Sequence, residues 1–421
     1  MFTDDFKETQ IGFLPKSWEV VTLGDLADYI NGYAFKPQQW ETVGRPIIRI
    51  QNLTGSSDTV NYFSGELDNR YFIESDDLLI SWSASLDAYI WQGDEAWLNQ
   101  HIFKVDNIVD KCDKRFLYFA LKHIIERIRG KTRGSTMKHI TRKEFVATPV
   151  MLPPLSEQQA IANVLSTVRQ AIEATEGVIA ATRELKRSMM KHLFTYGPVP
   201  VHEADQVSLK ETEIGDIPQD WSTKPLGELA REPIKNGAFI KRDRFGNGVP
   251  FLNVSDTYND ISVDLSKLER VECTQSELDR YRLLPNDLIF VRSSLKREGV
   301  GQCCIVENLD ESSIFDCHLM RVRIKEDEVI PKFLAYFYLS ALGKNALIAR
   351  SKTTTMTTIN QSGLSSAISP LPSLSEQNKI LNYLESVDEK IKTEIQRKAA
   401  LEELLNSLLH HLMTGKVRVK L

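Results

Sequence analysis

The stretch IGFLPKSWEVVTLGDLA, residues 11–27, returns later in the chain as IGDIPQDWSTKPLGELA, residues 214–230. Counted from Glu8 and Glu211, ten of twenty positions are identical, and they include the proline and the tryptophan of each copy. Identity at this density between two parts of one chain indicates an internal repeat. If the repeat extends beyond this stretch, further matches should follow in the same order.

A second match closes each copy. LPPLSEQQAIANVL at residues 152–165 returns as LPSLSEQNKILNYL at residues 371–384. Weaker matches lie between the two, such as NQHIFKV around His101 and DCHLMRV around His318. The chain is a tandem duplication of a unit of about 200 residues, which is long enough for each copy to build its own core.

Composition describes a globular protein. Hydrophobic residues make up 42% of the 421 residues and charged residues 26%, and no run of 18 apolar residues suggests a membrane span. The start, MFTDDFKET, lacks the basic and apolar segments of a secretory signal, which argues against export. Five cysteines without CxxC spacing argue against a disulfide framework and a zinc site, and they fit a reducing cytoplasm.

Charge is segregated along the chain although the net charge is only −5. Residues 1–95 hold 16 acidic and 6 basic side chains, whereas residues 111–143 hold 11 basic and 2 acidic ones. A basic stripe on a mildly acidic body can neutralise nucleic-acid phosphates. The alternative is a solvated helix face with no ligand.

Short apolar runs separated by turn residues predict strands in each copy. The runs are RPIIRI, NYFSG, DDLLISW and IFKV in the first copy, and VPFLNV, NDLIFV and LMRVRI in the second. A helical segment follows in each, at residues 115–128 and 332–348. Each copy is therefore predicted to be a mixed α/β domain.

A long helix is predicted after each LSEQ sequence, with Ser156 and Ser375 as N-caps and ends at Gly197-Pro198 and Gly415. An apolar seam sustained over roughly 40 residues is typical of a coiled coil, and each helix would be about 60 Å long. Antiparallel pairing of the two helices would satisfy both seams; independent homodimerisation through each helix is the alternative. The seam residues are Ile161, Leu165, Val168, Ile172, Ile179, Ile380, Leu384, Val387, Ile391, Leu401, Leu405 and Leu408.

Catalytic and nucleotide-binding motifs are incomplete. Gly130-Lys131-Thr132 resembles the end of a P-loop, but Ile125 stands where that loop needs a glycine. Glu184 and Lys186 have a nuclease-like spacing but lie on the predicted coiled coil. His101 and His318 are interpreted as core or turn histidines, because a ligand role needs partners that the sequence does not provide. We predict no catalytic residue and no metal site.

Two kinds of loop recur in both copies and carry side chains that are typical of a binding surface. The alternative is a pair of ordinary surface turns. The first kind combines a glycine, an aromatic residue and a lysine, and the second is basic and rich in hydroxyl groups. Such side chains anchor phosphates and read base edges. The candidate DNA-binding residues are Asn31, Tyr33, Lys36, Arg129, Lys131, Arg133, Ser135, Thr136, Lys138, His139, Lys235, Asn236, Lys241, Arg242, Arg350, Lys352, Thr353, Thr354, Thr355, Thr357 and Asn360.

With its repeated IGxxPxxWxxxxLGxLA opening and LPxLSEQ closing, the sequence resembles the specificity subunit of type I restriction-modification systems over essentially its whole length. The resemblance implies a non-catalytic protein that gives a DNA adenine methyltransferase its sequence specificity. Each copy would read one half of a bipartite, asymmetric double-stranded DNA site, and the helices would hold the halves apart. Two modification subunits would dock on the helices, joined in some systems by two restriction subunits. S-adenosylmethionine, ATP and Mg²⁺ would be bound by those partners, so this chain needs no cofactor.

The expected architecture is mixed α/β (α+β), with two pseudo-twofold-related target-recognition domains separated by two long helices in an antiparallel coiled coil. We expect the domains at residues 1–152 and 198–371, and the helices at residues 153–197 and 372–421, the latter with a C-terminal tail. Two other functions compete with this one. A coiled-coil scaffold would be indifferent to neutralising residues 129–138, and a stand-alone modifying enzyme would turn over S-adenosylmethionine by itself.

Overall fold

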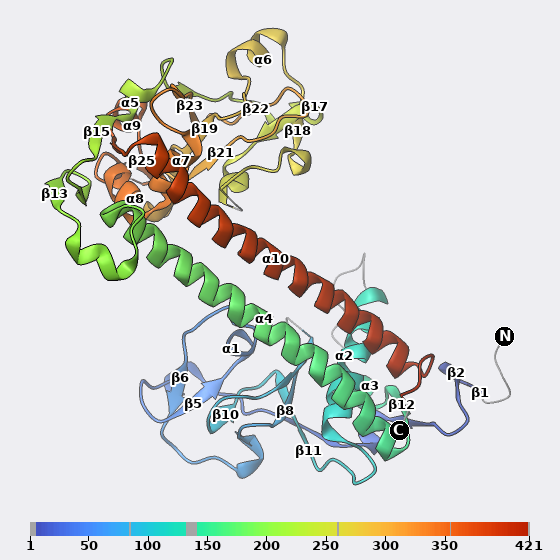
Figure 1. Cartoon of the computed structure of the whole chain (residues 1–421). Coiled ribbons are helices and arrows are strands. Elements are labelled where there is room, and N and C mark those ends of the chain that lie inside the picture. Colours follow the sequence, from blue (N-terminus) through green and yellow to red (C-terminus); the bar gives the residue numbers. More distant parts are fainter. Residues whose placement is uncertain (1–5, 84–85, 132–140, 259–260, 354, 420–421) are drawn as a thin grey trace. The chain divides into compact units, whose positions relative to one another are not determined.

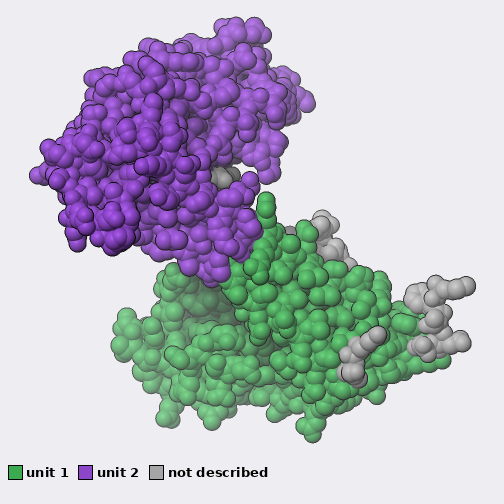
Figure 2. Space-filling view, in the orientation of Figure 1, with its two compact units in different colours: residues 1–176, 396–421 green, residues 177–395 purple. Residues whose placement is uncertain are grey.

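The chain divides into two compact units, which Figure 2 colours separately in the computed structural model. Unit 1 comprises residues 1–176 and 396–421, and unit 2 comprises residues 177–395. The structure describes residues 6–83, 86–131, 141–258, 261–353 and 355–419. Among these residues, no helix combines the length and the apolar character that a membrane span requires.

Unit 1 is built from short strands and helices (Figure 1). Its main sheet has the order β4-β11-β8-β9 and is antiparallel throughout, and its second sheet has the order β6-β5-β10-β7. Every residue of β8, LLIS, is buried, as expected for a central strand. The elements before the first long helix are β1 (Phe6–Thr9), β2 (Gly12–Pro15), β3 (Glu19–Thr22), β4 (Asp28–Asn31), β5 (Arg45–Ile48), α1 (Ile50–Leu53), β6 (Asn61–Phe63), β7 (Phe72–Ile73), β8 (Leu78–Ser81), β9 (Asp87–Ile90), β10 (Ala96–Leu98), β11 (Ile102–Asp106), α2 (Lys114–Lys131), α3 (Arg142–Val146) and β12 (Pro149–Leu152).

Unit 2 repeats this plan, because its main sheet β16-β23-β19-β21 corresponds strand by strand to β4-β11-β8-β9. Its central strand β19, LIFV, is again wholly buried. The elements between the two long helices are β13 (Leu209–Thr212), β14 (Gly215–Pro218), β15 (Ser222–Pro225), α5 (Leu226–Leu229), β16 (Lys235–Asn236), β17 (Phe245–Leu252), β18 (Arg270–Val271), α6 (Gln275–Tyr281), β19 (Leu288–Val291), β20 (Ser293–Ser294), β21 (Cys303–Ile305), β22 (Ile314–Phe315), β23 (Leu319–Val322), α7 (Pro331–Leu339), α8 (Ala341–Ile348), β24 (Lys352–Thr353), β25 (Thr357–Thr358), α9 (Gln361–Ser365) and β26 (Ile368–Leu371).

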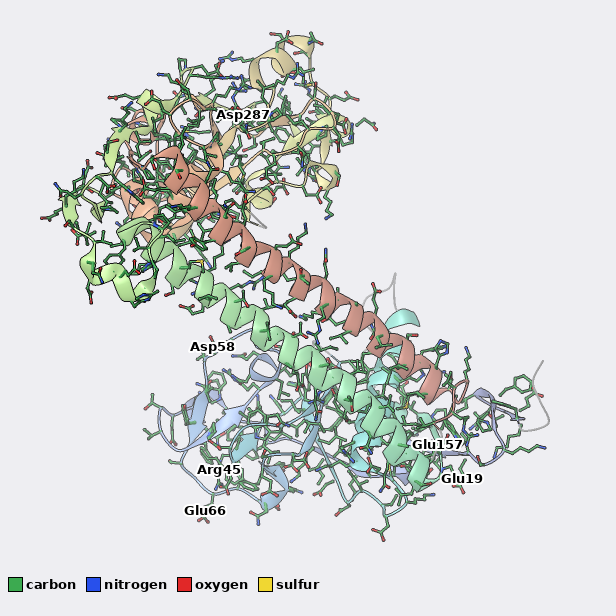
Figure 3. All side chains as sticks on the ribbon, viewed as in Figure 1. Glu19, Arg45, Asp58, Glu66, Glu157 and Asp287 are labelled. Atoms are coloured by element: carbon green, nitrogen blue, oxygen red, sulfur yellow. The ribbon has the colours of Figure 1, made fainter. Side chains whose placement is uncertain are left out.

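A charged pair lies at the same place in both main sheets, half-buried in unit 1 and buried in unit 2. Lys104 of β11 lies 3.3 Å from Asp77, and Arg321 of β23 lies 3.9 Å from Asp287. Asp287, labelled in Figure 3, is only 1% exposed and also accepts from Arg323 Nε at 2.8 Å. A buried carboxylate needs such partners, so the matching pairs are part of the shared fold rather than a ligand site.

The two long helices, α4 (Leu155–Tyr196) and α10 (Leu374–Met413), are antiparallel. In unit 1 the start of α4 shares a hydrophobic core with the end of α10, and in unit 2 the end of α4 shares one with the start of α10. Ion pairs also join the helices, Glu176 to Lys398 at 2.7 Å in unit 1 and Lys186 to Asp388 at 2.5 Å in unit 2. The predicted mixed α/β fold with an antiparallel pair of long helices is confirmed. All twelve predicted seam residues are buried or half-buried.

The repeated motifs fasten these helix ends to the sheets. Trp18 of the first copy is fully buried, and its indole N–H donates to Glu157 Oε2 at 3.0 Å, in the first turn of α4 (Figure 3). Trp221 of the second copy donates in the same way to Glu376 Oε1 at 3.1 Å, in the first turn of α10. The tryptophan of each opening motif is therefore the partner of the glutamate in the LSEQ sequence of the same copy.

The same tryptophans also meet the end of the other helix. Gly415, after α10, has a φ of +65° and lies so close to Pro15 that a Cβ would come within 2.7 Å of it. Gly197, after α4, has a φ of +80° and lies against Trp221. Only glycine adopts this helix-ending conformation without strain. The motifs repeat because each unit closes one helix start and one helix end in the same way.

Two details of the predicted helices are wrong. Helices α4 and α10 begin at Leu155 and Leu374, so Ser156 and Ser375 lie inside the first turn and are not N-caps. In α10 the cap is Ser373, whose hydroxyl accepts from Glu376 N at 3.3 Å.

The segment 332–348, predicted as one helix, forms α7 and α8. Ser340 ends α7 with an extended backbone and caps α8 by accepting from Gly343 N at 3.2 Å. A serine that can cap a new helix offers the backbone an alternative to continuing the old one.

Candidate nucleic-acid interface

A glycine-containing loop follows β4 in unit 1 and lies directly against the turn before β11. Gly32 N donates to Ile102 O at 3.0 Å. A Cβ on Gly32 would lie 2.2 Å from Asn99 O, so only glycine allows the two backbones to approach this closely. The loop at residues 31–36 is therefore fixed beside the turn at residues 99–101.

The equivalent loop of unit 2 makes the same contact. Gly237 N donates to Leu319 O at 3.2 Å, and a Cβ on Gly237 would lie 2.2 Å from Phe315 O. The loop at residues 236–241 is thus fixed beside the turn at residues 316–318. Both recurring glycine loops serve to bring a loop and a turn together.

The residue that follows the central strand is joined to the histidine of each turn. Trp82, after β8, donates its backbone N–H to His101 O at 3.1 Å. Arg292, after β19, donates its backbone N–H to His318 O at 2.8 Å. Trp82 and Arg292 therefore occupy equivalent places in the two units.

In unit 2 this backbone network continues to the second predicted loop. Ile359 N donates to Arg292 O at 2.9 Å, and β20, β25 and β24 form a small sheet in that order. Two loops more than a hundred residues apart in sequence are thus joined by backbone hydrogen bonds, and we define the platform of unit 2 as residues 235–241, 292–294, 316–318, 350–353 and 355–358.

Polar atoms without partners collect around the two turns. Buried side-chain atoms are normally hydrogen-bonded, so a group of exceptions marks a place prepared to receive something else. Among the described residues, four such atoms lie on or within a few residues of the glycine loops and the turns: Trp97 Nε1, Asn99 Oδ1 and His101 Nδ1 in unit 1, and Asn236 Oδ1 in unit 2. We define the platform of unit 1 as residues 31–36, 82 and 99–101.

The family model for the type I restriction modification DNA specificity domain matches the chain twice, at residues 15–182 and 218–403, which together make up most of it. The chain belongs to this family. It is accordingly the non-catalytic DNA specificity subunit of a type I restriction-modification system, and its mixed α/β regions are DNA-binding target-recognition regions. The resemblance inferred from the duplicated motifs is confirmed.

Relatives match over nearly the full chain. The specificity subunit of the type I restriction enzyme EcoBI from Escherichia coli is 27% identical, over 95% of this chain and 86% of the relative. That of MjaVIII from Methanocaldococcus jannaschii is 28% identical, over 99% and 97%. The crystal structure of the S subunit from M. genitalium covers 94% of this chain and 96% of its own, with a TM-score of 0.54 at 16% identity, which shows a shared fold.

The predicted DNA-binding residues in the first loop of the first copy differ in exposure. Asn31 is exposed and accepts from Trp82 Nε1 at 3.1 Å, while Tyr33 is half-buried and Lys36 is exposed. Lys36 N–H donates to Gln39 Oε1 at 2.9 Å, which fixes the backbone from which this exposed side chain extends. Asn31, Tyr33 and Lys36 thus lie together on the platform of unit 1.

The basic loop of the first copy is mostly outside the described residues. This applies to Arg133, Ser135, Thr136, Lys138 and His139. Arg129 and Lys131 lie in the last turns of α2 (Lys114–Lys131), where the backbone alone is described.

The first loop of the second copy presents its cations at the platform edge. Lys235 lies 3.7 Å from Glu232, and Lys241 is exposed. Arg242 is 80% exposed, lies 3.7 Å from Glu269 and covers the ring of Phe245. An arginine this exposed in so loose a pair can exchange its partner for a phosphate at little cost.

The second loop of the second copy divides into exposed and structural residues. Lys352, Thr353 and Thr355 are exposed, whereas Thr357 is buried and shares a hydrogen bond with Thr353 at 3.0 Å between hydroxyl oxygens. Thr354 lies outside the described residues.

Arg350 and Asn360, at the two ends of that loop, are engaged within the fold. The Arg350 side chain is 14% exposed, donates to Ala346 O at 2.9 Å and to Ser366 O at 3.0 Å, and pairs with Glu213. Asn360 caps α9 by accepting from Gly363 N at 2.7 Å. These two residues are better placed to hold the loop than to contact a ligand.

Sequence reasoning missed the middle of the unit 2 platform, where Arg292 and the β20 serines lie. Ser293, Ser294, Lys296, His318 and Met356 are among the residues that line an open hollow of about 600 Å³ beside it. The repeated histidine was the available signal, but it was interpreted as a turn residue. His101 does lie in a turn, because its φ is +75°. Its counterpart His318 is in addition exposed at the hollow.

One group on the platform has the residue types of a metal site. Within the part of the chain that the structure describes, the ligand atoms of Asp316, Cys317 and His318 lie within 4.8 Å of one another. Burial raises the pKa of the Cys317 thiol, and Asp316 acts in the same direction, so the thiolate that binds metal is disfavoured. Asp316 Oδ1 accepts from His318 N at 2.8 Å and faces His318 Nδ1 at 3.0 Å, which explains the grouping as a turn that orients the histidine.

Proposed function

We propose that the two platforms read the two halves of a bipartite, asymmetric site on double-stranded DNA. The supporting observation is the duplicated backbone frame that carries different side chains at equivalent places, Trp82 in unit 1 and Arg292 in unit 2. Two similar frames with different side chains suit two different half-sites. The reading domains would span residues 1–152 and 198–371, and the helical segments residues 153–197 and 372–421.

Within these domains, the exposed cations would anchor phosphates and the uncharged polar side chains of the loops would meet base edges. Lys36, Lys241, Arg242 and Lys352 belong to the first group, on the strength of their exposure. Asn31, Tyr33, Asn236, Thr353 and Thr355 belong to the second. The basic segment at residues 129–139 would add to the phosphate contacts of the first half-site.

The long helices would set the distance between the half-sites and dock two modification subunits. Readers on one face of a duplex lie about one helical turn apart, ~34 to 36 Å, or a multiple of it. Helices of 42 and 40 residues are roughly 60 Å long and can bridge one such turn. A solved structure of similar fold is titled for complex assembly and conformational transition of the type I system, which fits a role inside an assembly.

Cofactors belong to the partner subunits in type I systems generally. The modification subunits would hold S-adenosylmethionine and methylate adenine, and restriction subunits, where a system has them, would bring ATP and Mg²⁺. We place the assembly in the cytoplasm, where host DNA is modified. The contribution of this chain would be the choice of sequence alone.

The direct test is a single-molecule methylome of the host with and without this gene. The proposal expects an N6-methyladenine motif of two short halves around a fixed gap, present with the gene and absent without it. A methylome that does not change in a strain shown to express the modification subunits would contradict it.

The spacing role has a separate test. Inserting or deleting a few residues within 170–185 of α4 should lengthen or shorten the gap between the half-sites while leaving both half-sites unchanged. An unchanged gap in a variant that still methylates would count against the helices as a ruler.

A further inference from the structure

The equivalent residues Trp82 and Arg292 differ in how many partners their side chains have within their own unit. In unit 1, Trp82 Nε1 donates to Asn31 Oδ1 at 3.1 Å. Its ring stacks on Phe103 with 5.6 Å between centroids and lies 5.2 Å from the His101 ring. The polar atom and the ring of this side chain therefore have partners within unit 1 itself.

In unit 2 the same place is incomplete. Among the described residues, the Arg292 guanidinium has no hydrogen bond or ion pair, and Asn236 Oδ1, the counterpart of Asn31 Oδ1, is buried without a partner. In unit 1 the equivalent pair, Trp82 and Asn31, is hydrogen-bonded. Within the residues that the structure describes, a donor fork without a partner and an unsatisfied acceptor thus occupy the places of that pair in unit 2.

The backbone of Arg292 is fixed by hydrogen bonds, although its guanidinium has none in the described part of the chain. Its backbone N–H donates to His318 O at 2.8 Å, and its carbonyl accepts from Ile359 N at 2.9 Å. The preceding strand, β19, is wholly buried. A side chain that must discriminate between ligands needs such a fixed origin, because a loose one would adapt to every ligand.

We propose that Arg292 is a specificity-determining residue that reads a guanine in the half-site of unit 2. This inference rests on the proposed function. Guanine presents two acceptors, N7 and O6, on its major-groove edge, and the planar guanidinium has a matching pair of donors. His318 is a positioning residue, because its backbone carbonyl accepts from Arg292 N–H.

A phosphate is the other part of DNA that an arginine could bind, and the position of Arg292 argues against it. Arg292 lies half-buried inside the platform, whereas Lys296 and Arg297 are exposed on the neighbouring loop. Phosphates flank a groove and base edges form its floor, so the protruding cations suit phosphates and the recessed arginine suits a base.

The test compares Arg292→Ala, Arg292→Lys and the control Arg297→Ala in the complex with the modification subunits. Each complex selects from a library of duplexes randomised over both half-sites, and the bound fraction is sequenced. We expect Arg292→Ala to lose preference for G·C at one position of one half-site, by roughly 5- to 150-fold, with the other half-site unchanged. Arg292→Lys keeps the charge without the fork, and it should lose most of that preference while retaining overall affinity.

Arg297→Ala should weaken binding of all sequences alike, with no change in motif. Uniform weakening by Arg292→Ala would assign the residue to a phosphate, and an unchanged motif would remove it from the interface; either result overturns the inference. If Arg292→Ala does not fold, a wild-type motif from Arg292→Lys would overturn it as well. Failure of the proposed function itself looks different, because the wild-type complex would then select no bipartite motif at all.

Discussion

Replacing Glu157 with alanine should loosen unit 1 and leave unit 2 intact. The Glu157 side chain is about 4% exposed and serves two donors from distant parts of the chain. Trp18 Nε1 donates to Oε2 at 3.0 Å, and Arg418, from the tail beyond α10, contacts both oxygens at 2.5 and 2.7 Å. This carboxylate therefore joins the opening motif, the start of α4 and the end of the chain.

The expected loss is roughly 1.3–5 kcal/mol from three contributions. Trp18 is fully buried, and leaving its indole N–H without a partner costs about 1–3 kcal/mol. The Arg418 side chain is 45% exposed, so solvent screening limits its pair with Glu157 to about 0–1 kcal/mol. Loss of a negative charge in the first turn of α4 adds about 0.3–1 kcal/mol.

Hydrogen exchange followed by mass spectrometry measures this unit by unit, which a single unfolding curve of a two-unit chain does not. In Glu157→Ala, amides of residues 12–22 should exchange at least tenfold faster, since each 1.4 kcal/mol is a factor of ten, while residues 215–225 should not change. Glu376→Ala is the matched control and should give the reverse pattern, because Trp221 depends on Glu376. Arg418→Ala should have a smaller effect and add little to Glu157→Ala. Equal effects in both units, or an Arg418→Ala effect as large as that of Glu157→Ala, would refute this reasoning.

Three further predictions address helix propensity, acid stability and the platform. Gly177 lies inside α4 with open space where a Cβ would be, so Gly177→Ala should stabilise the chain by about 0.5–1 kcal/mol in urea unfolding; destabilisation would contradict this. Hydrogen bonds from Arg244 lower the pKa of Glu277 from its ordinary 4.5 to about 2. Its folded pKa is depressed, so its stabilisation is present above pH 4.5 and is lost as the pH falls towards 2. Exchange around α6 should therefore rise over this range less in Glu277→Gln than in the wild type, and identical profiles would refute it. A Cβ on Gly237 would lie 2.2 Å from Phe315 O, so Gly237→Ala should displace the loop and abolish selectivity for one half-site, as seen by methylome sequencing; an unchanged motif would count against the platform.

The sequence was sufficient for the parts of the fold that have a period or a repeat. The duplication predicted two similar units, and the apolar seams predicted two long antiparallel helices. The predicted N-caps were wrong because the serine of the S-E-Q motif lies inside the first turn of each helix. The residue that caps α10 is Ser373, which lies just before the helix. The break at Ser340 was missed because both halves of the segment are strongly helical on their own.

The platform was predicted only in part, for a physical reason. The glycine loops could be found because they recur, but Arg292 reaches them only through strand pairing. It lies beside His318 because β19 pairs with β23, and beside Ile359 because β20 pairs with β25. Such neighbours are set by tertiary register, and in sequence Arg292 lies in the unremarkable run VRSS. Arg350 shows the converse. Its polar, basic neighbours in sequence predict an exposed side chain, but in the structure its guanidinium donates to the carbonyls of Ser366 and Ala346.

The central claim is that each unit reads its own half-site, and a unit exchange tests it most directly. Residues 20–150 would be replaced by the corresponding domain of another specificity subunit, and the host methylome would be sequenced for both proteins. The account predicts that one half of the methylated motif changes while the other half and the gap stay the same. A motif in which both halves change together, or in which neither changes, would contradict it.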